Sequence, residues 1–128
     1  LFRSLAFWDI LPTVADLDQT KVHSDGISFL PLLNGQGVQQ THQVLYWEFH
    51  EMKGRVAIRK GKWKLIRYDL TAETPGHWEL YDLVDDPGEL HDVAGTQPAL
   101  VQELLEQIKA EHLDSEVFPL SESQILGQ

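Results

Sequence analysis

The sequence of 128 residues contains no cysteine. Without cysteine the chain can form no disulfide, offers no thiolate nucleophile and has no sulfur ligand for zinc, and its redox compartment stays open. No apolar run approaches the ~18 residues of a membrane-spanning helix, so we expect no membrane partner. The N-terminus shows no signal peptide and begins with Leu1 rather than Met. This start suggests a piece of a longer protein.

Positive charge is also scarce. Ten Lys and Arg face twenty Asp and Glu, which gives a formal net charge of −10. We expect no nucleic-acid partner, because neutralising phosphates requires a surplus of cations. Seven of the ten cations lie between Lys53 and Arg67. The stretch "RKGKWKLIRYDL", residues 59–70, is therefore either a recognition strip for an anion or the solvated face of a hairpin.

What the chain does contain is enough apolar sequence for one domain, with a hydrophobic fraction of 42%. Apolar residues with a helical period predict a helix from about Asp9 to Leu17, with Asp9 as a candidate N-cap and Pro12 in the first turn. Nearly every face of this helix is apolar, which indicates burial against further protein. A turn-rich connector follows, with one helical turn expected at residues 30–33.

From His42 onward the pattern is typical of β structure. Four aromatic and β-branched segments predict four strands in succession: residues 42–50, 55–60, 62–70 and 77–83. Glycine at position 61 favours a tight turn between the second and third strands. The segment "TQPALVQELLEQIKAEH" predicts an amphipathic helix capped by Thr96. The fold class is therefore α+β, an antiparallel four-stranded sheet packed against one long C-terminal helix.

Polar side chains gather in the loop from His50 to Arg55, between the first two strands. One interpretation is an ordinary hairpin loop, and the other is a substrate-facing loop with His50, Lys53 and Arg55 as binding residues. A metal site here is disfavoured, because adjacent His50 and Glu51 point to opposite sides of a strand. The acidic segment "DLVDDPGELHD" lacks the spacing of a calcium loop and predicts a turn in which Asp side chains cap backbone amides.

No complete catalytic set is recognisable. The sequence has no Gly-x-Ser-x-Gly elbow and no glycine-rich phosphate loop. We therefore expect no catalytic residue and no metal ligand in this chain.

Five blocks nevertheless resemble, in order, the C-terminal part of type I sulfatases, which belong to the alkaline phosphatase-like superfamily. They are "FWDILPTVADL", "DGISFLPLLNG", "LYWEFHE", "VAIRKGKWKLIRY" and "ELYDLVDDPGELHDVA", and with the closing helix they cover residues 7–112. The resemblance implies that residues 1–41 are a helix and connector of a large α/β domain, residues 42–113 the C-terminal subdomain, and residues 114–128 a tail.

The resemblance also implies chemistry. Sulfatases hydrolyse sulfate esters with a formylglycine nucleophile, made within a Cys/Ser-x-Pro-x-Arg motif, and with a divalent cation, usually calcium. Neither this motif nor the Asp-Asn metal pair occurs here, so the chain alone should be inactive and its parent should carry both groups. The implied partners are the large N-terminal domain and an anionic sulfated small molecule or glycan. The implied location is periplasmic or secreted.

Within that resemblance, the loop at His50, Lys53 and Arg55 corresponds to a position that helps to shape the substrate pocket, where cations orient an anion. Two alternatives remain. One is a phosphodiesterase or phosphonate hydrolase of the same superfamily, and the other is a noncatalytic glycan-binding or interaction module.

Overall fold

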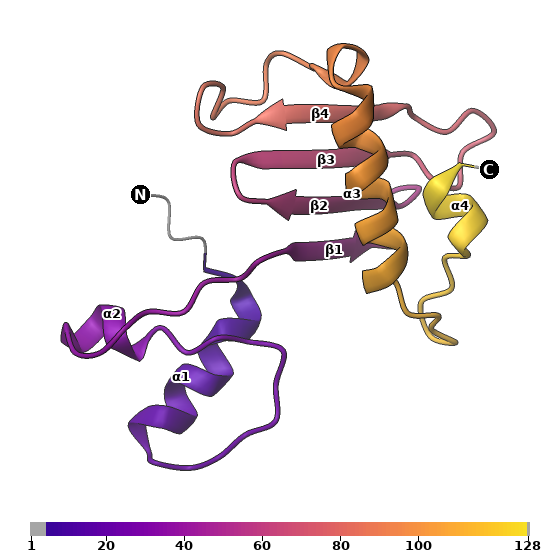
Figure 1. The fold of residues 1–128 in the computed structure, drawn as a ribbon. Helices are drawn as coiled ribbons and strands as arrows, with labels where there is room; N and C mark the ends of the chain where they lie inside the picture. The colour runs from indigo at the N-terminus through magenta and orange to yellow at the C-terminus, as the bar shows by residue number, and fades with distance from the viewer. Residues whose placement is uncertain (1–4, 128) are drawn as a thin grey trace. The chain divides into compact units, whose positions relative to one another are not determined.

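The structure is a computed structural model that describes residues 5–127, and the chain forms two compact units, residues 1–43 and 44–128 (Figure 1). The first unit contains the helices α1 (Ile10–Leu17) and α2 (Leu30–Asn34). Both lie where the sequence predicts them, with Pro12 in the first turn of α1. None of the helices within residues 5–127 has the length and apolarity to cross a membrane.

Asp9 organises the first unit, although not in the predicted way. It precedes α1 but makes no side-chain cap there. Its fully buried carboxylate instead accepts the backbone N–H groups of Ala6 and Ile27 at 2.7 and 2.8 Å, and lies 2.7 Å from His42 Nε2. Burial raises the pKa of Asp9, but these three partners outweigh it and hold the pKa below its ordinary value. One carboxylate thus ties together three segments of this unit.

The second unit is the predicted sheet and helix. The strands are β1 (Leu45–Phe49), β2 (Arg55–Lys60), β3 (Trp63–Tyr68) and β4 (Trp78–Asp82). They pair antiparallel in the order β1-β2-β3-β4. Gly61, at φ +59°, makes the tight turn between β2 and β3 as expected. The α+β class predicted from the sequence is therefore confirmed.

The long helix α3 (Pro98–Glu111) covers one face of the sheet (Figure 1). Alternation along the strands sends one set of apolar side chains toward it. The main core joins strands, helices and loops through buried residues Val56, Ile58, Leu65, Leu70, Leu80, Leu104, Ile108, Leu120 and Ile125. Trp63 is partly buried and packs against this cluster, so it serves the core.

Two features at the C-terminal end differ from the sequence analysis. Thr96 does not cap α3, because the N-cap residue is Gln97 and the Thr96 hydroxyl donates to the Val93 carbonyl at 2.9 Å. The expected tail contains a short helix, α4 (Glu122–Leu126), whose Ile125 is buried in the main core. Its N-cap is Ser121, which accepts the backbone N–H of Gln124.

Arg67 holds α4 against the sheet. Its guanidinium donates to the carbonyl oxygens of Gly76, Gln124 and Ile125 at 2.7, 3.3 and 3.1 Å. The residue is buried, and burial lowers its pKa. A cation fits here because it meets the C-terminal carbonyls of a helix, where the partial charge is negative.

Candidate functional site

The predicted substrate loop connects β1 to β2 through residues 50–54 and is conformationally strained. Met52, Lys53 and Gly54 all have positive φ, at 53°, 69° and 78°. Left-handed backbone costs a residue with a side chain about 1–2 kcal/mol and is confined mostly to turns and functional sites. Glycine accounts for position 54, but the other two residues adopt this conformation against their own preference.

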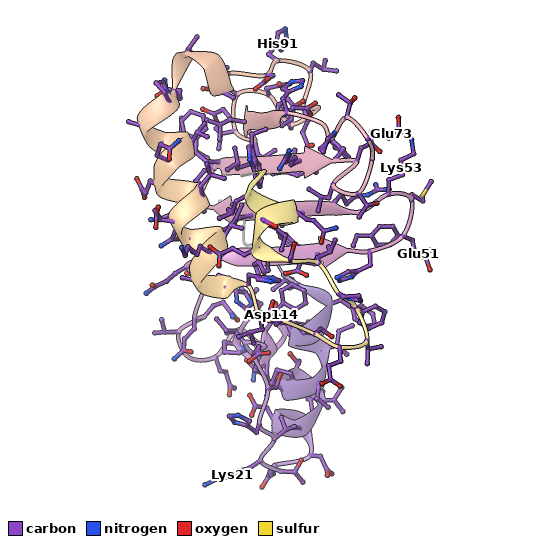
Figure 2. All side chains as sticks on the ribbon, turned by 90° about the vertical axis from the view of Figure 1, so that its right-hand side faces the viewer. Lys21, Glu51, Lys53, Glu73, His91 and Asp114 are labelled. Atoms are coloured by element: carbon purple, nitrogen blue, oxygen red, sulfur yellow. The ribbon has the colours of Figure 1, made fainter. Side chains whose placement is uncertain are left out.

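Lys53 stands at the centre of this strain. Thr71 fixes it by donating both its backbone N–H, at 2.9 Å, and its hydroxyl, at 3.1 Å, to the Lys53 carbonyl. The side chain is exposed and points outward from the end of the sheet (Figure 2). In the described part of the chain it forms no ion pair. The loop therefore holds the backbone of a free cation in one place.

Arg55 begins β2, directly after the loop, on the face of the sheet opposite α3. Its guanidinium carbon lies 4.8 Å from the centre of the Phe49 ring and 5.9 Å from that of Tyr68. These cation–π contacts hold the charge over an aromatic surface. Arg55 and Lys53 are thus both available to an anion at this end of the sheet.

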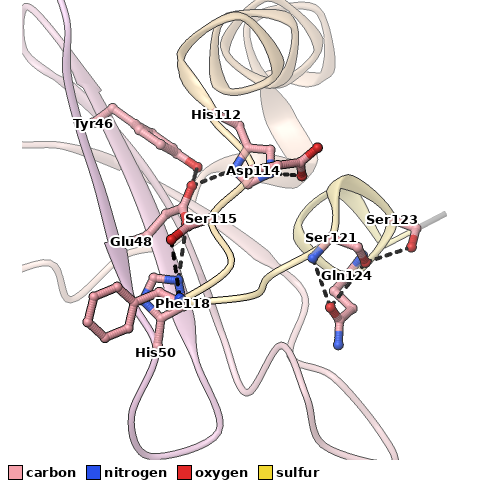
Figure 3. Close-up of polar contacts among 10 residues, drawn as sticks. All are labelled: Tyr46, Glu48, His50, His112, Asp114, Ser115, Phe118, Ser121, Ser123 and Gln124. Carbon is pink, nitrogen blue, oxygen red and sulfur yellow. Dashed lines mark hydrogen bonds and ion pairs between the residues drawn. The ribbon is translucent and has the colours of Figure 1, made fainter.

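His50 lies apart from Lys53 and Arg55 and contacts other residues. Its Nε2 lies 3.3 Å from Glu48 Oε2, and its ring stacks at a tilt on Phe118, with 5.1 Å between the ring centroids. Phe118 lies in the segment between α3 and α4 (Figure 3). The structure therefore separates the three predicted residues, because His50 faces the α3 side of the sheet and Arg55 the other side.

Glu48 is the centre of a polar cluster that the sequence analysis missed (Figure 3). Its Oε1 accepts the Tyr46 hydroxyl at 2.5 Å and the ring N–H of His112 at 2.6 Å. Burial and the Glu48 carboxylate raise the pKa of Tyr46. Burial disfavours charge on His112, but Glu48 and Asp114 outweigh it and raise the pKa of that ring. No signal near His50 in the sequence points to His112.

The lysines of "RKGKWKLIRYDL" each pair with a carboxylate. Lys60, Lys62 and Lys64 lie 2.6, 2.5 and 2.6 Å from oxygens of their partners, which are Glu103, Asp82 and Glu89 in that order. Ion pairs of this kind at a surface contribute little stability. They nevertheless balance the positive charge of each lysine with a carboxylate, so that little of it is left to attract an anion. The hairpin interpretation of these lysines is therefore the better one.

The acidic turn after β4 behaves as predicted. Asp86 Oδ2 accepts the backbone N–H groups of Leu90 and His91, both at 2.8 Å, and these bonds keep its pKa below the ordinary value. Among residues 5–127, no three His, Asp or Glu side chains come together as a metal site. The described residues therefore offer no cluster of three such side chains for the calcium that the sulfatase resemblance implies for the parent protein.

The family model described as N-sulphoglucosamine sulphohydrolase, C-terminal, matches residues 5–116. The chain is 34% identical to choline-sulfatase of Rhizobium meliloti over 86% of its own length and 22% of that protein. It is also 34% identical to human arylsulfatase A, over 85% of the chain and 27% of the relative. The chain thus spans about a quarter of these proteins.

Solved structures give the same picture. The protein BT4656, solved with its substrate D-glucosamine-2-N,6-O-disulfate, aligns with a TM-score of 0.63 and 26% identity over 80% of this chain and 22% of its own. The phosphonate monoester hydrolase of Agrobacterium radiobacter aligns with a TM-score of 0.56 and 25% identity over 88% of this chain and 28% of its own.

Proposed function

Because the chain belongs to the family of N-sulphoglucosamine sulphohydrolase C-terminal domains, and is a sulfatase C-terminal domain, we propose that its protein is a sulfuric ester hydrolase. Its substrate is a sulfated glycan or an aryl sulfate. The observation that carries the proposal is the family match over residues 5–116. In this proposal a separate N-terminal domain supplies the catalytic centre, and the isolated chain is inactive.

The part of this chain in the reaction is to orient the anion. Lys53 and Arg55 provide positive charge at the β1–β2 end of the sheet, on backbone that the bonds from Thr71 and the β2 ladder keep in place. A positioned cation neutralises a sulfate without needing to rearrange, which is the most effective electrostatic arrangement. His50 contributes indirectly, by its contacts with Glu48 and Phe118.

The nucleophile and metal of the proposed enzyme lie outside this chain. A formylglycine and a calcium ion would supply the attacking oxygen and the polarisation of the sulfate. Both groups, and a periplasmic or secreted location, remain predictions from the family.

The first unit supports a partner domain. Helix α1 exposes Ile10, Leu11, Val14 and Leu17 along its length, with 46–61% of each residue accessible. An apolar surface of this kind on a short helix is typical of a buried interface. We propose that the large domain covers it.

A phosphonate hydrolase is the second candidate, because the solved phosphonate monoester hydrolase has a related fold. Both reactions break a bond to a tetrahedral oxyanion centre, and Lys53 and Arg55 suit either anion. The intact protein assayed with 4-nitrophenyl sulfate and with 4-nitrophenyl phenylphosphonate distinguishes them. We expect faster release from the sulfate, and a preference for the phosphonate would contradict the sulfatase assignment.

The role of the loop has its own test. In the intact protein we expect Lys53→Ala and Arg55→Ala to raise KM for a sulfate ester about tenfold, while the melting temperature changes little. Lys62→Ala is the matched control, because Lys62 lies at the other end of the strands and pairs with Asp82. Unchanged KM in both loop variants would remove the loop from the substrate pocket.

A further inference from the structure

The sheet has a second face, opposite α3, that carries a hollow of about 360 Å³. Within residues 44–127 the helices α3 and α4 both pack against the main core on the other side of the sheet. The hollow lies across β1, β2 and β3 and ends at the turn after β4. Its volume is at the small end of the range for ligand pockets, roughly 300–1,000 Å³. We call this hollow the open-face groove.

Aromatic and aliphatic side chains form the surface of the open-face groove. Trp47 and Phe49 alternate on β1 toward this side and are 37% and 43% exposed. Ala57 and Ile66 make a buried floor beside them. Flat aromatic rings beside an apolar floor suit the C–H face of a sugar ring, which is itself apolar.

Cations form the rim. Arg55, Arg59 and Lys64 line the groove. Among residues 5–127 its one acidic lining residue is Glu89, which is already bound by Lys64 at 2.6 Å. Arg59 donates through Nε to the Gly61 carbonyl at 3.1 Å, which leaves its terminal N–H groups available. In the described part of the chain neither arginine pairs with a carboxylate.

The positive charge of the groove favours an anionic ligand over an apolar one. The chain as a whole has a net charge of −10, yet the groove is positive. An apolar segment of protein placed there would remove water from two arginines without replacing it, which is costly. An anionic ligand instead accepts their N–H groups in the paired geometry that guanidinium favours.

We propose that the open-face groove binds a sulfated saccharide, with a sugar ring against Trp47 and the apolar floor and with its sulfate groups toward Arg59 and Arg55. The identity of the anion as sulfate rests on the proposed function. The groove thereby extends the cationic loop at Lys53 into a longer track along β1 and β2, so that a substrate of more than one sugar is held along the sheet.

The test is calorimetric titration of the intact protein with D-glucosamine-2-N,6-O-disulfate, with unsulfated glucosamine as the second probe. We expect measurable binding of the sulfated sugar alone, weakening as salt rises. Arg59→Gln and Trp47→Leu should each raise Kd about tenfold. Lys60→Gln is the matched control. Lys60 follows Arg59 on β2, so its side chain points to the other face of the sheet, where it pairs with Glu103. We expect this variant to bind the sulfated sugar with the Kd of the wild type.

Two results would overturn the proposal. One is an unchanged Kd in both Arg59→Gln and Trp47→Leu, with each variant shown to be folded by its circular dichroism. The other is carbene footprinting of the intact protein in which Trp47 and Phe49 resist labelling before any sugar is added, since another part of the protein then covers the groove. Labelling that the sulfated sugar suppresses supports the proposal.

Sulfate release, measured in parallel, separates this inference from the proposed function. Suppose that the wild type releases sulfate while Arg59→Gln binds the sulfated sugar with the wild-type Kd. That result would overturn the proposed saccharide binding in the groove and leave the sulfatase assignment standing. Binding that depends on Arg59, without release of sulfate from any ester, supports the groove and overturns the assignment.

Discussion

Glu48 and His112 meet at 2.6 Å, between Oε1 and Nδ1, and this contact joins the edge strand β1 to the C-cap residue of α3. The two residues are 64 positions apart. The His112 side chain is only 7% exposed, so the contact is largely shielded from water. His50 approaches the other oxygen of the same carboxylate. One acidic group thus stands between two imidazoles.

This contact predicts a pH dependence of stability. The pKa of His112 in the folded protein is raised above its unfolded value of about 6.5. A raised pKa means that the folded state binds the proton more tightly, so the stabilisation is complete below about pH 6.5 and is lost as pH rises through the folded pKa. We expect His112→Gln to cost about 2 kcal/mol at pH 5.5 and much less at pH 9. Urea unfolding at both pH values measures the difference.

The control for that prediction is His91→Gln. His91 lies on the surface, with its side chain 79% exposed and 3.6 Å from Asp86. We expect His91→Gln to change the free energy of unfolding by the same small amount at pH 5.5 and at pH 9. A pH-independent cost for His112→Gln would show that the ring acts only by packing.

Arg67 should be essential for docking α4. We expect Arg67→Met to destabilise the protein by about 3 kcal/mol, because three carbonyl oxygens lose a charged donor. Lysine at this position should not restore stability, because an ammonium cannot match the spread of the guanidinium. Thermal unfolding checks both variants. Lys109→Met is the comparison, since Lys109 also contacts α4, through an exposed pair with Glu122 at 2.9 Å, and should matter little.

Leu104 measures how far α3 contributes to the core. It is fully buried against the sheet. We expect Leu104→Ala to cost about 3 kcal/mol, from lost burial and the cavity that remains. Leu113→Ala, at a residue that is 82% exposed, should cost below about 0.5 kcal/mol. Equal melting temperatures for these two variants would contradict the packing described here.

Lys53 offers a test of whether strain serves binding. Asparagine tolerates positive φ better than lysine does, so we expect Lys53→Asn to keep or slightly raise stability, by up to about 1 kcal/mol. The same variant should raise KM for a sulfate ester, because it removes the cation. If Lys53→Asn instead lowered both the free energy of unfolding and KM, then Lys53 would serve the fold and not substrate binding. Chemical denaturation and steady-state kinetics on one preparation give the two numbers.

The sequence predicted the sheet well because its signals are local. Alternation in β2 and β3, glycine at 61 and the stripe on α3 each operate within a few residues. Helix α4 was not predicted, because five residues are too few to show a helical period. Its position also depends on Arg67, which precedes its partners Gln124 and Ile125 by 57 and 58 residues. The His112–Glu48 contact escaped for the same reason. His50 and Arg55 were grouped because they are close in sequence, whereas they belong to opposite faces of the sheet.

The burial of Ile125 has a consequence for biosynthesis. The four strands leave the ribosome well before this residue, but the face that they offer to α3 stays incomplete until Ile125 and Leu120 arrive to close it. Until then the nascent sheet exposes apolar surface, a condition that favours aggregation and recruits chaperones. Early termination of translation before Ile125 would therefore leave the apolar face of the sheet without one of the buried side chains that complete it.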